Sequence, residues 1–467
     1  MEKWSDATKH CFTSPLHAFS TPTPHHSPVP ILLSKMSHPP LHHSTTPSRR
    51  WLVALCMGLA LLTSAAHADE PFRPEAGKFP PLEKAHAYRG ELVFVDHANR
   101  RGSLRVEGTG KFYRNDPHPF AMLPYGIVRY QGAPADLRDI PLGTVMHVRA
   151  FFPPDPKTSV VPVLPVDSKS KDAGHYRGTG IFPAENHVLL LEDEPSHCLR
   201  EGLVWKLREV EVKNGEGTIT AIRAPKQGGD AKAAEDMMTF DSATRIWRGS
   251  ERIGVARMVA DAAWPASGKK KLGGQPVHLG ITWKPAPGDG LSGAFTRFHI
   301  SDIWLDEAAI EQAAQFQTET HKGFIRGRWM PAWVDAVEYG KFGRATVTAT
   351  LFGGMDASLY ADFQKGVQAQ MNGAENTLKH AGGHYGPGHI ASNGQITAIT
   401  KADGKIPLGS SGIQIQFETD LIIEGIRPTR VIRVRPESWP KRQIPREEYV
   451  NDSLEERFPT PAIFPKY

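Results

Sequence analysis

Cysteine is scarce in this chain, with three in 467 residues. Two of them, Cys11 and Cys56, lie in an amino-terminal stretch that we expect to be removed, which leaves Cys198 alone. An intramolecular disulfide is therefore excluded in the remainder, even in an oxidising compartment. A chain of this length can bury a sizeable core without such cross-links, and its length predicts two or three domains.

Long apolar runs are also missing. The run "WLVALCMGLALL" at 51–62 has twelve residues, whereas a membrane-spanning helix needs about 20. Two arginines precede it and "AHA" (66–68) follows it, a pattern typical of a secretory signal peptide. We expect residues 1–68 to be a disordered leader plus signal peptide, removed after Ala68, with Sec and twin-arginine export both open. The mature chain is then expected in the periplasm, at the cell surface or outside the cell, with no stable membrane span.

An excess of charge of one sign is absent as well. The formal net charge is +5, and removal of the five Lys/Arg and two Asp/Glu residues in 1–68 leaves +2. A nearly neutral chain lacks the cationic surface that binds phosphate backbones by charge neutralisation. We therefore expect no nucleic-acid partner.

The familiar catalytic signatures are absent too. The chain has no G-x-S-x-G elbow, no H-E-x-x-H, no Walker A loop and no Rossmann glycine pattern. The acidic segment "LEDEPS" (191–196) is predicted to be a solvated turn, and Cys198 a structural thiol. These observations predict no catalytic residue and no bound cofactor.

The chain does contain many short alternating strands bounded by glycine. Leu92, Phe94, Leu104 and Val106 alternate with other residues around the turn "HANRRG", which predicts a hairpin. The arrangement returns later, because 127–132 resembles 245–249 and 143–148 resembles 274–279. A looser third copy spans 418–439, with Gly425 at its turn. We interpret these copies as internal repeats.

Two helices are predicted to interrupt the strands. Residues 306–323 have acidic residues in the first turn and glycine at the end. Residues 356–381 begin with the candidate N-cap Asp356 and have apolar residues at helical spacing, although Gly366 and Gly373 weaken that helix.

The fold predicted from these patterns is mainly β, with two or three OB-like five-stranded small barrels and helical connectors. We expect the following segments: a Pro-rich lead at 69–85, a first barrel at 86–165, a second at 185–305, a connecting helix at 306–323, a third module at 324–437 with the inserted helix 356–381, and an extended Pro-rich tail at 438–467.

The first module resembles the secreted bacterial OB-like small-barrel domains of unknown function. The matching positions are Gly90, Val93, Val95, Asp96, Leu104, Val106, Gly132, Leu137, Asp139, Leu142, Gly143, Val145 and Val148. The match spans about 65 residues; Tyr125 stands where the family usually has threonine, and the later modules match less well. The resemblance implies a fold and a compartment, and it brings no catalytic residues.

Three histidines form the candidate metal site. His380, His384 and His389 in "KHAGGHYGPGHIA" could supply enough imidazoles for zinc. The alternative is a helix that ends at 381, just before Gly382, and a loop with incidental histidines, since no acidic residue lies in this stretch to orient the rings. Zinc is thus the one cofactor that the sequence leaves open.

Trp329 and Trp333 form a candidate ligand surface, because flat aromatic side chains often bind glycans, although tryptophan also fills the cores of small barrels. We expect an exported, non-catalytic binding or scaffolding protein, whose partner is a protein or a cell-envelope polysaccharide. Two alternatives stay open: a metal-dependent hydrolase centred on the three histidines, and a glycan-binding protein that uses exposed tryptophans.

Overall fold

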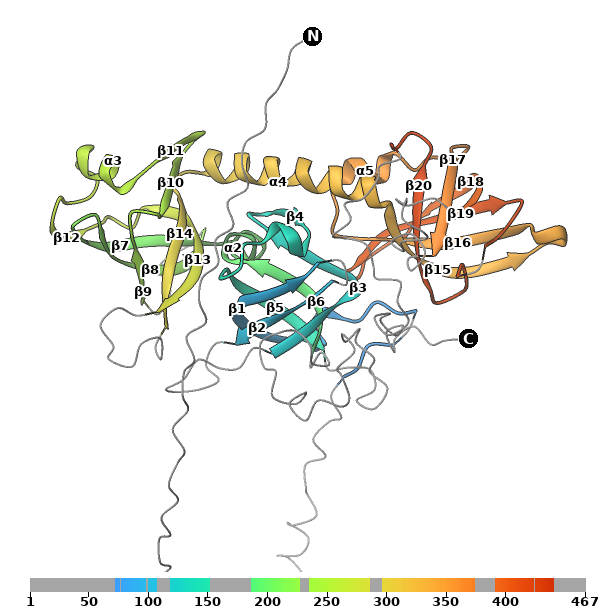
Figure 1. Cartoon of the computed structure of the whole chain (residues 1–467), viewed down its shortest axis with the longest axis horizontal. Helices are drawn as coiled ribbons and strands as arrows, with labels where there is room; N and C mark the ends of the chain where they lie inside the picture. The colour runs from blue at the N-terminus through green and yellow to red at the C-terminus, as the bar shows by residue number, and fades with distance from the viewer. Residues whose placement is uncertain are drawn as a thin grey trace, which may run out of the picture. The chain divides into compact units, whose positions relative to one another are not determined.

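The protein was analysed as a computed structural model, which describes residues 72–75, 77–97, 100–106, 118–151, 186–226, 235–285, 296–373, 391–423 and 425–440 (Figure 1). The chain divides into two units, Met1–Asp69 and Glu70–Tyr467, and every described residue belongs to the second. The predicted leader and signal peptide therefore lie outside the described residues. No helix among the described residues is long and apolar enough to cross a membrane.

The predicted fold class is confirmed: the described chain is mainly β and forms small closed barrels. The first barrel contains β1 (His86–Asp96), β2 (Arg101–Val106), β3 (His118–Tyr130), β4 (Ala133–Ala135), β5 (Val145–Phe151) and β6 (Asn186–Asp193). The sheet order is β2-β1-β5-β6-β3-β4, and pairing of β2 with β3 closes it. Strand β6 completes this barrel, although we expected its residues to belong to the second barrel (185–305).

The second barrel repeats this connectivity. Its strands are β7 (Leu203–Lys213), β8 (Glu216–Pro225), β9 (Glu235–Phe240), β10 (Arg245–Arg248), β11 (Glu251–Ile253), β12 (Gly268–Lys271), β13 (Pro276–Pro285) and β14 (Thr296–Trp304). In both barrels the third long strand pairs in parallel with the last one, as β3 with β6 and β9 with β14. The helices α2 (Glu194–Glu201) and α3 (Val255–Ala260) accompany these strands.

The third barrel is antiparallel throughout. It consists of β15 (Met330–Tyr339), β16 (Ala345–Phe352), β17 (Gln368–Gly373), β18 (Ser392–Lys401), β19 (Ser410–Thr419) and β20 (Val431–Pro436), closed in the order β15-β16-β19-β18-β17-β20. The six strands differ from the five expected. Short 3₁₀ turns, η1 (Leu82–Lys84), η2 (Leu137–Asp139) and η3 (Lys341–Gly343), complete the described elements.

The predicted helix at 356–381 is wrong over much of its described part. Asp356 does cap a helix, but this helix, α5, spans only Ala357–Ala361. Gly366 then adopts a left-handed φ of +89°, and the chain enters β17. Ala369 and Met371 alternate toward the barrel core, because the neighbouring strands β18 and β20 supply backbone partners for an extended segment.

The predicted helix at 306–323 is confirmed and is longer than expected. Helix α4 spans Glu307–Arg328, with Asp306 as its N-cap. Gly323 lies inside the helix instead of ending it. A glycine there costs about 1 kcal/mol relative to alanine. We attribute the extension to contacts after the glycine, where Ile325 is buried in the third barrel's core.

One pair of backbone hydrogen bonds recurs in all three barrels. A residue of the first strand donates its N–H to a carbonyl just before β5, β13 or β20, and accepts an N–H from the residue preceding that carbonyl. The equivalent triplets are Leu92, Thr144 and Gly143; Leu207, Gln275 and Gly274; and Val334, Arg430 and Thr429. The last member of each triplet has positive φ. Gly143 and Gly274 are thus equivalent, as the repeat predicted. In the third barrel the equivalent residue is Thr429, whereas we expected the corresponding turn at Gly425.

A second feature is shared by the first two barrels: an aspartate lies at or just after the end of the last strand. Asp193 accepts a hydrogen bond from a backbone N–H of α2 at 3.1 Å and another from the Gln131 N–H, in the turn after β3, at 2.8 Å. Asp306 accepts equivalent bonds from α4 at 2.8 Å and from the Gly249 N–H, in the turn after β10, at 3.0 Å. Each carboxylate therefore holds a helix and a hairpin turn together.

Replacement of Asp306 by alanine should lower the free energy of unfolding by about 2 kcal/mol, because two hydrogen bonds to a carboxylate at a helix N-terminus are lost. Asp306→Asn keeps an acceptor and should recover most of that loss. Urea denaturation followed by tryptophan fluorescence measures both variants. An alanine variant as stable as the parent protein would show that this cap does not hold α4.

Candidate ligand-binding site

The three candidate metal ligands, His380, His384 and His389, lie outside the described residues. Their role as a zinc site therefore stays a prediction. Among the residues that the structure does describe, no group of three or more His, Cys, Asp or Glu side chains could hold a metal ion.

The two tryptophans predicted to form a ligand surface are buried. Trp329 is 1% exposed and Trp333 is 3% exposed. Trp333 belongs to an apolar cluster that joins the first and third barrels, together with Leu123, Tyr125, Phe151, Leu189 and Phe352. The guanidinium of Arg435 lies 5.4 Å from the ring centroid of Trp329. As placed, both side chains fill the interior and neither offers an open aromatic face.

The carboxylates of "LEDEPS" are buried, so the solvated turn predicted there is wrong. Glu192, Asp193 and Glu194 are 2%, 3% and 0% exposed. Glu194 accepts hydrogen bonds from His147 at 2.6 Å and from Trp205 at 2.9 Å, and it pairs with Arg223. The segment is buried because β6 lies between β5 and β3 in the first barrel and α2 packs against β7 and β13.

This acidic cluster has the character of a structural element. Although burial opposes its ionisation, the hydrogen bond and charge of His147 and the charge of Arg223 lower the pKa of Glu194 to about 2. Burial, followed by the charge of Glu194, raises the pKa of the Cys198 thiol, which suits a structural thiol and not a nucleophile. The second barrel has a weaker version of the same pair, His278 with Glu307 at 3.4 Å.

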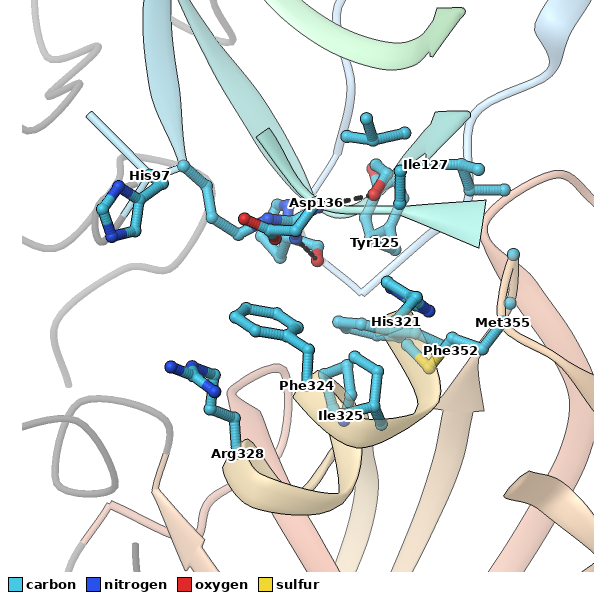
Figure 2. Close-up of a pocket in the computed structure, with 18 of the residues that line it drawn as sticks. His97, Tyr125, Ile127, Asp136, His321, Phe324, Ile325, Arg328, Phe352 and Met355 are labelled. Carbon is cyan, nitrogen blue, oxygen red and sulfur yellow. Dashed lines mark hydrogen bonds between the residues drawn. The ribbon is translucent and has the colours of Figure 1, made fainter. Parts of the chain in front are cut away.

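A different feature offers a place for a ligand. A cavity of about 70 Å³ lies between the first barrel, α4 and the third barrel (Figure 2). Its walls come from the β1–β2 turn, β3, β4, the last two turns of α4, the segment after β16, and β20. In Figure 2, Asp136 and Tyr125 project from the first barrel, while Phe324 and Arg328 project from α4.

Helical spacing places the α4 residues on one face. His321, Phe324 and Arg328 are three and four positions apart, so they lie along one side of the helix. Phe324 packs between two guanidiniums, with the Arg138 and Arg328 carbons 4.0 Å and 4.1 Å from its ring centroid. Gln317 donates to Asp139 of η2 at 3.0 Å. These contacts attach α4 to the first barrel and set the width of the cavity.

The cavity is electrostatically unbalanced. Arg100, Arg328 and Arg433 line it, and Asp136 is the one carboxylate among the lining residues that the structure describes. Arg100 donates to the backbone carbonyls of Pro124 and Gly126 at 2.6 Å and 2.7 Å. Burial raises the pKa of Asp136, an effect that the Arg100 charge opposes. The described lining therefore carries more positive than negative charge.

The excess of positive charge in the described lining affects Arg433 most clearly. It donates to the carbonyls of Arg328 and Trp329 at the end of α4, at 3.0 Å and 3.3 Å. Burial, and then the charges of Arg100 and Arg328, lower its pKa to about 10, so it stays protonated at neutral pH. Its Nε atom is buried without a hydrogen-bond partner among the described residues.

His321 is a titratable group of the cavity wall. Burial, then the charges of Arg100, Arg129 and Arg138, lower its pKa to about 4, and Asp356 opposes this effect. Its Nδ1 atom has no hydrogen-bond partner in the described part of the chain. At neutral pH the ring is therefore an uncharged wall residue.

No pattern in the sequence marks these cavity residues as a site. Arg100 belongs to a predicted turn, Asp136 to a connector and Arg433 to a strand, and only the tertiary fold brings them together. The available signal was the spacing of His321, Phe324 and Arg328, which continues the helical face beyond Gly323.

Comparisons of the chain with protein-family models, with curated proteins and with solved structures found no match. The cavity and the barrels are therefore the basis for the functional argument.

His321 predicts an acid-sensitive stability. Its pKa is lowered in the folded protein, so the unfolded chain binds the extra proton first, and stability falls as the pH drops from about 6.5 to about 4. In the His321→Gln variant, the free energy of unfolding should fall by about 3 kcal/mol less over this pH range than in the parent protein. Urea denaturation at several pH values measures it, with the exposed His86→Gln as the control. Identical pH profiles for the parent protein and His321→Gln would contradict the placement of this ring.

Proposed function

We propose that this chain is an exported binding protein that holds its ligand in the cavity beside α4 and performs no chemistry of its own. The observation that carries the proposal is the cavity, whose lining combines guanidinium donors with aromatic and aliphatic side chains. Sites for small molecules typically have such a composition. The lining residues that the structure describes include no Ser, Thr, Cys or Lys that could act as a nucleophile.

The position of the cavity on the first barrel supports the proposal. OB-like barrels commonly bind ligands on their second and third strands and in the loop between the first two. Here His97 and Arg100 come from the β1–β2 turn, and the segment from Pro124 to Val128 comes from β3. The cavity thus occupies the region of the barrel where ligand binding is most common.

Export has its own test. The exported chain should begin at Asp69, because the signal pattern places cleavage after Ala68. Mass spectrometry of the protein recovered from the periplasm or the medium measures the first residue. Arg49→Gln with Arg50→Gln should leave the precursor in the cytoplasm. Recovery of full-length chain outside the cytoplasm would contradict the signal-peptide assignment.

Ligand binding should depend on the free space of the cavity. Met355 lines it, so Met355→Trp should fill it and prevent binding. Met237 is exposed on the second barrel, and Met237→Trp is the matched control. Each variant is purified without denaturation, and native mass spectrometry measures the mass that unfolding releases. We expect a small molecule from the parent protein and the control, and none from Met355→Trp.

Two outcomes would overturn the binding proposal. One is stoichiometric zinc together with hydrolytic activity, both lost in His384→Ala, which would favour the metal-dependent hydrolase. The other is the same released mass from Met355→Trp as from the parent protein, which would place the ligand elsewhere.

A further inference from the structure

We infer that the cavity beside α4 recognises a single anionic group the size of a phosphate or a small carboxylate. This inference rests on the proposed ligand-binding role of the cavity and specifies the chemistry of the ligand. The same group could arrive as a free ion or as the charged end of a larger molecule.

The first support is the placement of charge. Arg100 comes from the β1–β2 turn, Arg328 from the last turn of α4 and Arg433 from β20. Three elements from distant parts of the chain thus deliver guanidiniums to one small space, opposed by Asp136. Guanidinium groups present planar, paired donors that match phosphate and carboxylate oxygens.

The second support comes from two buried polar atoms of the cavity lining. The Arg433 Nε and His321 Nδ1 atoms are buried without hydrogen-bond partners among the described residues. A buried polar atom without a partner is destabilising, and partly buried cations repel one another. An anion among these groups would offset the repulsion, and modest side-chain adjustment would offer it the Arg433 Nε–H donor and, in the tautomer protonated at Nδ1, the His321 N–H.

The third support is size. A water molecule needs about 10–15 Å³ of cavity volume, so a cavity of about 70 Å³ accommodates on the order of five waters. Phosphate and acetate have a similar number of non-hydrogen atoms. Ile127, Phe352 and Met355 form an apolar part of the wall, against which a larger molecule could extend from its charged end.

Binding of inorganic phosphate and of acetate to the mature chain, 69–467, tests this inference by calorimetry and by thermal unfolding. Sodium chloride at equal ionic strength controls for general salt effects, and glycerol controls for a neutral solute. We expect phosphate or acetate to bind and to raise the unfolding temperature beyond either control. If only a larger natural ligand binds tightly, free phosphate or acetate should compete with it.

Two substitutions should change the affinity in opposite directions. Arg433→Gln removes a charge but keeps a donor for the α4 carbonyls, and it should weaken anion binding by about tenfold to a hundredfold. Asp136→Asn removes the opposing charge, and asparagine can still cap η2, so binding should strengthen by about threefold or more. Arg344→Gln is the matched control, because Arg344 is an exposed arginine of the third barrel that pairs with Asp420.

The outcomes separate this inference from the proposed function. Equal anion affinity in the parent protein and Arg433→Gln, or no response to either anion, would overturn the anion site. Release of a neutral molecule that Met355→Trp excludes would overturn it too, yet would leave the binding function standing. Anion binding that survives in Met355→Trp, with no released ligand in any variant, would overturn both.

Discussion

The hydrogen bonds of Asp306 anchor the start of the helix that forms one wall of the candidate site. This carboxylate starts α4 and at the same time holds the turn after β10, so it fixes the helix to the end of the second barrel. The far end of the same helix carries His321, Phe324 and Arg328 into the cavity. The wall of the cavity therefore depends on a cap at the opposite end of a 22-residue helix.

The protein contains buried charge of two kinds. Around Glu194 the carboxylate accepts hydrogen bonds from His147 and Trp205 and pairs with Arg223, so this buried charge has its partners within the protein. Around Arg433 positive charge exceeds negative charge and a donor is unpaired in the described residues. The cavity is the stronger candidate for binding, since a buried donor without a partner is destabilising unless something binds there.

Much of the fold follows from local patterns. Alternating strands, positive-φ glycines such as Gly143 and Gly274, and the aspartate before α4 are readable because strand periodicity, turn conformation and helix capping are each set within a few residues. Predictions were wrong where distant strands decide the structure. The segment after Asp356 has helical spacing, yet it forms β17 because β18 and β20 provide its hydrogen-bond partners. The segment around Glu194 was predicted to be exposed because a sequence does not show which residues a neighbouring barrel covers.

By itself, the sequence determined the mainly β class, the organisation into small barrels and the start of the long helix. These depend on periodicity, turn residues and capping, which are short-range effects. Tertiary structure alone decided that Trp329 and Trp333 fill the interior and that Arg100, Asp136 and Arg433 meet in one cavity. Burial and charge balance arise from contacts between residues far apart in the chain, so no local pattern could reveal them.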